Sequence, residues 1–111
     1  MKKLKALFHV DEMGKWKLTL KNINNFLNGA EDPDILVVAN AVAVKGYLPD
    51  YELFETMKEL NKKGVVFSAC NNALKGNNVE LKDIGEFIKI VPAGVIEIAE
   101  KQMEGYAYIR P

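Results

Sequence analysis

The sequence predicts an α/β protein in which a mainly parallel, five-stranded sheet carries helices on both faces. Apolar runs typical of strands alternate with segments of helical periodicity along the chain. The run Ile35–Ala39 is continuously apolar rather than alternating, which is typical of a strand covered on both faces. The 111 residues contain no internal repeat, low-complexity tract or linker, so we expect a single domain over residues 1–111.

The first third of the chain predicts a strand, a helix and a second strand. Leu4–Val10 is apolar apart from Lys5 and His9, and a polar turn follows it. Apolar residues then recur at spacings of four, three and four, which predicts the buried face of an amphipathic helix: Trp16, Leu20, Ile23 and Leu27. Asn28-Gly29 ends this helix, and Ile35–Ala39 forms the next strand.

Aliphatic residues continue past the predicted end of the second strand. Ala41–Val44 follows it before Lys45-Gly46 turns the chain. A loop with this much apolar surface needs a cover, because large apolar patches are uncommon on the surface of monomers. Either the loop packs on its own domain, or it forms part of an interface between subunits.

The middle of the chain predicts a helix, a strand and a short helix. The first of these helices has an apolar face and ends at Gly64; the face is Tyr51, Leu53, Phe54, Met57 and Leu60. Val65–Phe67 is a short β-branched and aromatic run, which predicts a buried strand. Asn71 and Asn72 offer side chains that can cap the short helix that follows.

The last third predicts a fourth strand, a helix and a fifth strand. A helical turn is expected over Glu80–Ile84 and a strand over Phe87–Val91. Pro92 fits the first turn of a helix. The apolar positions of this helix are Val95, Ile98, Ala99 and Gln102 or Met103. Gly105–Ile109 forms the final strand.

Charge balance and residue counts exclude several functional classes. Fifteen basic and fifteen acidic side chains cancel, so we expect binding neither to nucleic acid nor to an anionic membrane. One cysteine cannot form an intrachain disulfide, and no apolar stretch nears transmembrane length, so a cytoplasmic protein is expected. A single cysteine and a single histidine do not supply a structural zinc site, and no glycine-rich nucleotide-binding motif indicates a cofactor.

Candidate site residues follow the predicted strands. His9, Asn40 and Cys70 come at or near the ends of the first three strands, where parallel α/β folds bind ligands. Cys70 would face the amides at the start of a helix, which favour an anion, so a reactive thiolate is one interpretation. The other is a small buried apolar side chain, since free cysteine is among the most buried residue types. Asn71 and Asn72 indicate polar surroundings.

The chain resembles the DsrE/DsrF-like family, of the YchN-like fold. The similarity spans nearly the whole sequence and rests on five blocks: Phe8-His9, Asn22–Asn25, Ala69–Leu74, Val91–Val95 and Gln102–Pro111. The sequence departs from many relatives at two places. Asn40-Ala41 stands where a His-Gly pair is common, and Asn72-Ala73 stands where Asn-Thr is common.

This resemblance implies a three-layer α/β/α protein that assembles as a homotrimer or homohexamer. It also implies a sulfur carrier or sulfurtransferase-like activity, with sulfane sulfur held as a persulfide on Cys70 and exchanged with donor and acceptor partners. His9, Asn40, Asn71 and Asn72 would then support the cysteine. A single thiol is enough for this chemistry, whereas an intrachain dithiol oxidoreductase needs two. The alternative is an oligomeric module of the same fold that binds a small ligand or a protein without turnover.

Overall fold

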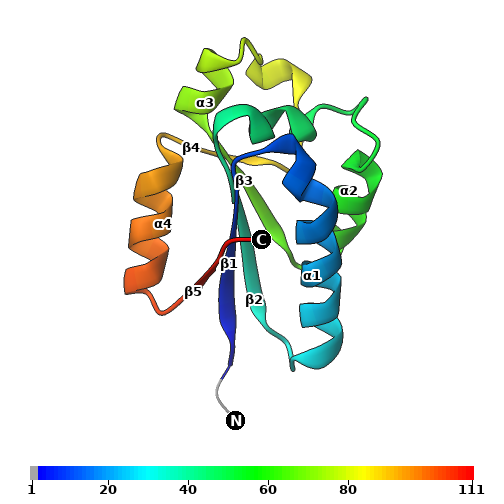
Figure 1. The fold of residues 1–111 in the computed structure, drawn as a ribbon, viewed down its shortest axis with the longest axis vertical. Helices are drawn as coiled ribbons and strands as arrows, with labels where there is room; N and C mark the ends of the chain where they lie inside the picture. The colour runs from blue at the N-terminus through cyan, green and yellow to red at the C-terminus, as the bar shows by residue number, and fades with distance from the viewer. Residues whose placement is uncertain (1–2) are drawn as a thin grey trace.

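The protein folds around one five-stranded sheet in which every neighbouring pair of strands is parallel. The computed structural model describes residues 3–111. The strand order is β4-β3-β2-β1-β5, so the first four strands step in one direction and the fifth returns beside the first (Figure 1). The strands are β1 (Lys5–Val10), β2 (Asp34–Ala39), β3 (Val66–Cys70), β4 (Lys89–Val91) and β5 (Ala107–Ile109).

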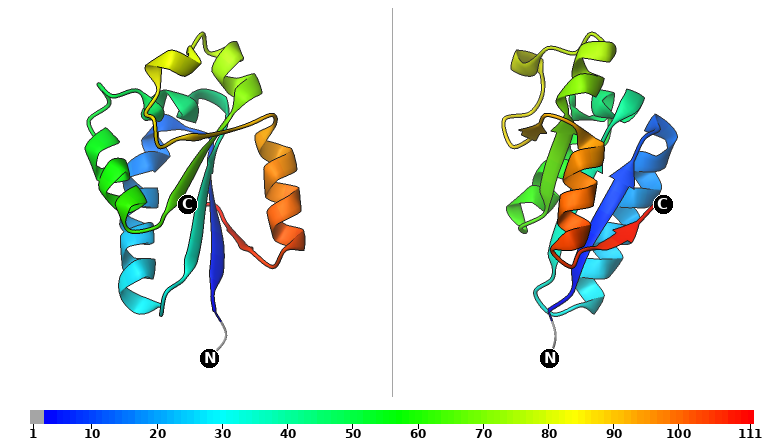
Figure 2. Two further views of the ribbon diagram at one scale, coloured as in Figure 1. Left: turned by 180° about the vertical axis from the view of Figure 1, so that it is seen from behind. Right: turned by 90° about the vertical axis from the view of Figure 1, so that its left-hand side faces the viewer.

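The helices form a layer on each face of the sheet, as the alternating pattern predicts. Figures 1 and 2 show α1 and α2 on one face, α4 alone on the other, and α3 above the carboxyl ends of the strands. The α-helices are α1 (Trp16–Gly29), α2 (Phe54–Lys62), α3 (Asn71–Gly76) and α4 (Gly94–Met103). Within residues 3–111, three 3₁₀ segments complete the structure: η1 (Met13–Lys15), η2 (Ala41–Tyr47) and η3 (Leu81–Asp83).

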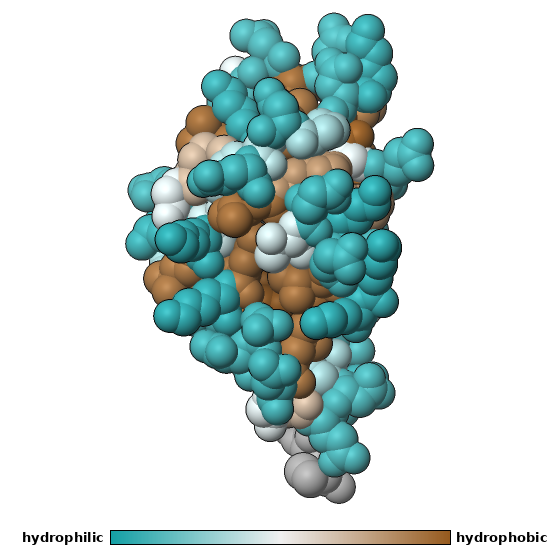
Figure 3. Space-filling model, turned by 90° about the vertical axis from the view of Figure 1, so that its right-hand side faces the viewer, coloured by the Kyte–Doolittle hydropathy of each residue, from teal (hydrophilic) through white to brown (hydrophobic). Residues whose placement is uncertain are grey.

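The main core lies between the sheet and the α1/α2 layer. Trp16 and Tyr47 are fully buried there, with ring centres 5.3 Å apart, and the Trp16 indole donates a 3.0 Å hydrogen bond to the carbonyl of Ala43. On the outside of this layer, apolar side chains run along the middle of the face between polar ones (Figure 3). The larger of the two cores therefore lies on this side of the sheet.

The aliphatic segment after β2 packs on its own domain, the first of the two predicted alternatives. It forms η2, in which Ala43 and Val44 are fully buried, while Val42 remains 37% exposed. Ala41 begins the segment with φ of +51°, the left-handed region that favours glycine. The chain turns there from the sheet into the helical segment.

The opposite face has a thinner cover, and one sequence prediction is wrong there. Only three buried apolar residues form its core cluster, with Ile98 and Tyr106 packed against them: Leu7, Leu36 and Val38. Most of the predicted apolar face of α4 points outward, since Val95, Ala99 and Met103 are exposed and Glu97 is buried instead. Of the predicted positions, Ile98 does pack against the sheet. Apolar periodicity identifies a helix but does not say which partner its apolar face contacts.

Two predictions about helix starts are wrong, whereas one about the end of a helix is confirmed. Pro92 precedes α4, whose N-cap is Ala93, so the proline is outside the first turn. Asn71 and Asn72 do not cap α3, because the helix begins directly after β3 with Cys70 at the N-cap and no side-chain cap bond. Gly64 does adopt the positive φ of a helix-terminating glycine, at +101°.

Candidate functional site

A row of side chains crosses the carboxyl end of the sheet on the face that α4 covers. The row comes from four consecutive strands of the sheet, β5, β1, β2 and β3. In that order its members are Tyr108, His9, Asn40, which directly follows β2, and Cys70. Alternation along parallel strands puts these residues on the same face as the small core cluster of Leu7 and Val38. The sequence prediction that His9, Asn40 and Cys70 meet at this edge agrees with the structure.

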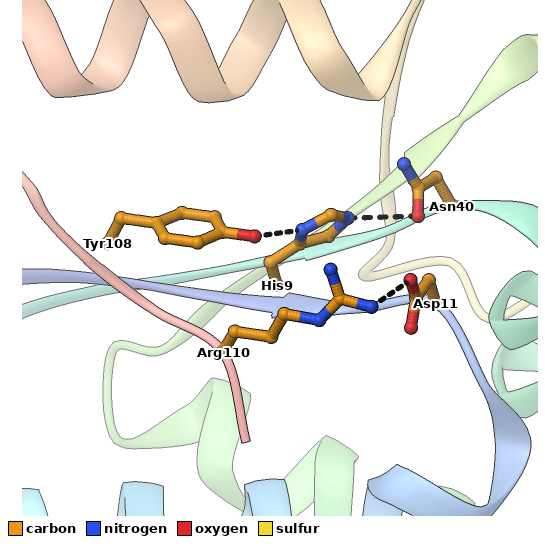
Figure 4. Close-up of polar contacts among 5 residues, drawn as sticks. All are labelled: His9, Asp11, Asn40, Tyr108 and Arg110. Atoms are coloured by element: carbon orange, nitrogen blue, oxygen red, sulfur yellow. Dashed lines mark hydrogen bonds and ion pairs between the residues drawn. The ribbon is translucent and has the colours of Figure 1, made fainter.

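His9 is held from both sides by hydrogen bonds. Its Nε2 lies 3.0 Å from Asn40 Oδ1, and its Nδ1 contacts the Tyr108 hydroxyl (Figure 4). Because an amide oxygen only accepts, Nε2 carries a proton, and in the neutral tautomer Nδ1 accepts from the Tyr108 hydroxyl. Both ring nitrogens are therefore occupied, and His9 does not act as the base of a Cys70–His9 pair in this arrangement.

Asn40 connects the histidine to the neighbourhood of the cysteine. Its amide nitrogen points away from His9 in Figure 4, and it makes no hydrogen bond to any of residues 3–111. The strand on the other side of β2 from β1 is β3, which ends at Cys70. A Cβ placed on Gly94 would lie 3.4 Å from both the Asn40 Cβ and the Cys70 Cβ, so these two atoms are at most twice that distance apart.

Cys70 is the last residue of β3 and is 7% exposed. Its backbone pairs with Val91 in β4, and Gly94 at the start of α4 lies against its Cβ. In residues 3–111 the thiol makes no hydrogen bond, and no second cysteine exists for a disulfide. Cys70 is thus nearly buried, and the residue against its Cβ, Gly94, has no side chain.

The helix that follows Cys70 contributes less to the thiol than the sequence pattern indicates. α3 has six residues, and neither Asn71 nor Asn72 makes a capping bond. Asn71 is half-buried and Asn72 is exposed. The dipole of so short a helix is small, because it grows with the number of aligned peptide units. The two asparagines therefore flank the thiol without bonding to it.

Sequence reasoning missed three residues near the row. Tyr108 was predicted only as part of the final strand, but its hydroxyl bonds to His9. Arg110 forms a 2.8 Å ion pair with Asp11 beside the histidine (Figure 4). Gly94 allows α4 to approach Asn40 and Cys70 closely. The polar alternation of the last strand was the available signal for the first two, whereas Gly94 had none.

Metal-ligand clusters and membrane-spanning helices were sought in the described part of the chain. Among residues 3–111, no three side chains of the histidine, cysteine, aspartate or glutamate type come together as metal ligands would. Within the same range, none of the helices combines the length and the apolar character that crossing a bilayer requires. The chemical groups available at the row are one thiol, one amide, one imidazole and one phenol.

Comparison with known proteins gives a consistent family. The model of the DsrE/DsrF-like family matches residues 4–111. The solved structure of MTH1491 from Methanobacterium thermoautotrophicum, described as a protein of unknown function, is 33% identical and has a TM-score of 0.93, covering 98% of this chain and 100% of that one. The ychN protein of E. coli shares the fold at 13% identity and a TM-score of 0.81, with all of both chains covered. A comparison with curated proteins found no match.

Proposed function

The chain belongs to the DsrE/DsrF-like family, and from that premise and the position of Cys70 we propose that it carries sulfane sulfur as a persulfide on this cysteine. The family is generally linked to sulfur relay, and Cys70 is the only thiol in the chain. The observation that carries the proposal is the placement of this thiol at the carboxyl edge of the sheet, beside an amide with free donors. The whole chain would act as a single domain of this family, in the cytoplasm, where thiols stay reduced.

The proposed chemistry needs no oxidant or cofactor. The Cys70 thiolate attacks the outer sulfur of a donor persulfide, the donor's S–S bond breaks, and the donor leaves as its thiolate. Cys70 then holds the new S–S bond. An acceptor thiolate attacks the outer sulfur in the same way, which releases Cys70 for another cycle. Both steps are exchanges, so atoms and electrons balance.

The neighbouring residues have distinct roles in this proposal. The Asn40 amide donates a hydrogen bond to the charged sulfur, since hydrogen bonds to ionised groups are stronger than those between neutral groups. His9 and Tyr108 orient Asn40 by fixing its oxygen. Asn71 and Asn72 keep the approach to the thiol polar. A sulfur donor and an acceptor protein would reach Cys70 from this side.

We further propose that the protein is a homo-oligomer, a trimer or hexamer. The support is the outward face of α4, on which Val95, Ile96 and Met103 are 64%, 58% and 91% exposed. A helix that turns its apolar residues outward is typical of a subunit interface. Light scattering coupled to size exclusion should give a trimeric or hexameric mass. Ile96→Glu should lower that mass, whereas Lys17→Glu on the exposed side of α1 should not; a monomeric wild type would contradict the proposal.

The carrier function is tested by mass spectrometry of the native protein after incubation with a persulfide donor. We expect Cys70 to gain the mass of one sulfur atom, and a thiol acceptor to remove it. Cys70→Ser should gain nothing, and Asn40→Ala should accumulate the adduct more slowly. An unmodified Cys70 with several donors would refute the carrier function. Full biological function in Cys70→Ser would favour the alternative, a module of this fold that binds without turnover.

A further inference from the structure

A buried carboxylate on α4 lacks a partner. Glu97 faces the sheet, is 8% exposed, and its Oε1 makes no hydrogen bond within residues 3–111. Buried polar groups are almost always hydrogen-bonded, because removing a charge from water without compensation is costly. The orphaned oxygen therefore indicates a bonding group that is absent from the chain itself.

Glu97 lines a small cavity between α4 and the amino-terminal half of the sheet. The cavity has a volume of about 140 Å³, and Val66, Lys89, Lys101 and Tyr106 are among the residues around it. Val66 begins β3 and Cys70 ends it, so the cavity and the thiol lie toward opposite ends of that strand. The cavity is separate from the proposed sulfur site.

The other charges around the cavity divide into paired and unpaired groups. Asp34 pairs with Lys3 at 3.2 Å, and Lys101 pairs with Glu104 at 3.5 Å. Within residues 3–111, neither Glu97 nor Lys89 forms a direct ion pair, with each other or with another side chain. Burial lowers the pKa of Lys101, whereas Glu104 and, less strongly, Glu97 raise it, so Lys101 lies near Glu97 without bonding to it. One negative and one positive charge without a direct partner thus line the same cavity.

We infer that this cavity binds a small zwitterion of the amino acid class, with its ammonium group at Glu97 and its carboxylate at Lys89. Such a ligand satisfies both charges at once, which neither a simple amine nor a simple carboxylate does. The volume of about 140 Å³ lies below the roughly 300–1,000 Å³ of pockets for drug-sized ligands. At about 30 Å³ per water molecule it corresponds to only a few waters. Glycine and alanine are therefore of suitable size, and large aromatic amino acids are not.

The test is a titration of the full chain, followed by amide chemical shifts in solution. Glycine and L-alanine should give saturable shifts at the start of β3, in β4 and in the middle of α4, whereas ethylamine, acetate and L-tryptophan should bind at least tenfold more weakly. Glu97→Gln and Lys89→Met should each weaken glycine binding at least tenfold. Glu100→Gln removes the same charge from an exposed position of the same helix and should bind as the wild type does.

Three results would overturn the inference. The first is the absence of saturable shifts with glycine and L-alanine. The second is ethylamine binding as tightly as glycine, which would leave Lys89 without a role. The third is an equal loss of thermal stability in Glu97→Gln and Lys101→Met without any ligand effect, which would assign Glu97 to a pair within the helix. Cys70→Ser should bind glycine normally, so failure of the sulfur proposal would leave this result unchanged.

Discussion

The accessibility of Cys70 decides between a carrier thiol and a buried structural one. We predict that a thiol reagent modifies Cys70 in the native protein about one order of magnitude more slowly than in the unfolded protein. The prediction follows from its burial, because a residue that is 7% exposed reacts through small local openings rather than through global unfolding. Gly94, which has no side chain, lies against the Cys70 Cβ, so we expect a small movement at the start of α4 to be enough for such an opening.

If Cys70 were a buried structural thiol, its labelling rate in the native protein would be far lower. A domain of ordinary stability unfolds at a cost of about 5–15 kcal/mol, and each 1.4 kcal/mol or so corresponds to a factor of ten. If Cys70 reacted only from the unfolded state, native labelling would therefore be slowed by more than about three orders of magnitude. The two mechanisms are separated by at least about two orders of magnitude in rate.

The assay compares labelling rates in native buffer and in concentrated guanidinium, with the reagent in excess. Cys70→Ser gives the background. Gly94→Ala is the matched probe of this contact, because its new Cβ would lie 3.4 Å from the Cys70 Cβ and 3.3 Å from a methyl carbon of Val38. It should slow native labelling while leaving the unfolded rate unchanged. Native labelling that is slowed more than a thousandfold in the wild type would refute the reasoning and, with it, the carrier role.

Three further predictions concern the scaffold and are measured by guanidinium denaturation. Gly46→Ala should destabilise the fold by about 3 kcal/mol, because its Cβ would lie about 2.4 Å from Trp16 Nε1; Gly29→Ala, with open space around it, is the control, and equal effects would contradict the clash. Ala41→Gly should stabilise by about 0.5–1 kcal/mol, since φ is +51° and the relief of left-handed strain exceeds the entropic cost of glycine; a loss of stability would disprove this. Burial raises the pKa of Tyr47 well above its usual value, so folding keeps a proton that the unfolded chain loses above pH about 10, and stability should fall there by up to about 1.4 kcal/mol per pH unit. Tyr47→Phe should remove that part of the slope, and an unchanged slope would contradict the assignment.

The fold was largely predictable because its signals are local. The periodicity from Trp16 to Leu27, the apolar run of β2 and the glycine at the end of α2 each specify one element without long-range information. The strand order was not predictable. It depends on which strands pair across the sheet, and β5 lies beside β1 although about a hundred residues separate them. The outward direction of most apolar residues of α4 was also not predictable from the sequence. It depends on what packs against the helix, and these exposed residues do not contact this chain.

The positions of the site residues could be predicted from the sequence, but the contacts between their side chains could not. The ends of β1, β2 and β3 indicated His9, Asn40 and Cys70, since parallel strands place their carboxyl ends at one edge. The bonds that define the arrangement join β5 to β1 and β1 to the end of β2. They depend on register and side-chain direction, which one sequence does not specify. Hence Tyr108 was missed, and the sequence could not show whether His9 reaches Cys70.

The single helix on the α4 face explains why the site lies where it does. One helix cannot cover five strands, so residues on either side of it stay partly exposed, among them Val66 of β3 at 41% and Tyr108 of β5 at 39%. On the opposite face, α1, α2 and η2 enclose the core, and Trp16 and Tyr47 are fully buried. A sulfur donor or acceptor that reaches Cys70 must therefore approach past α4 or over the carboxyl edge. The start of α4 is where these two routes meet, and Gly94 is the residue there whose lack of a side chain brings the helix close to Cys70.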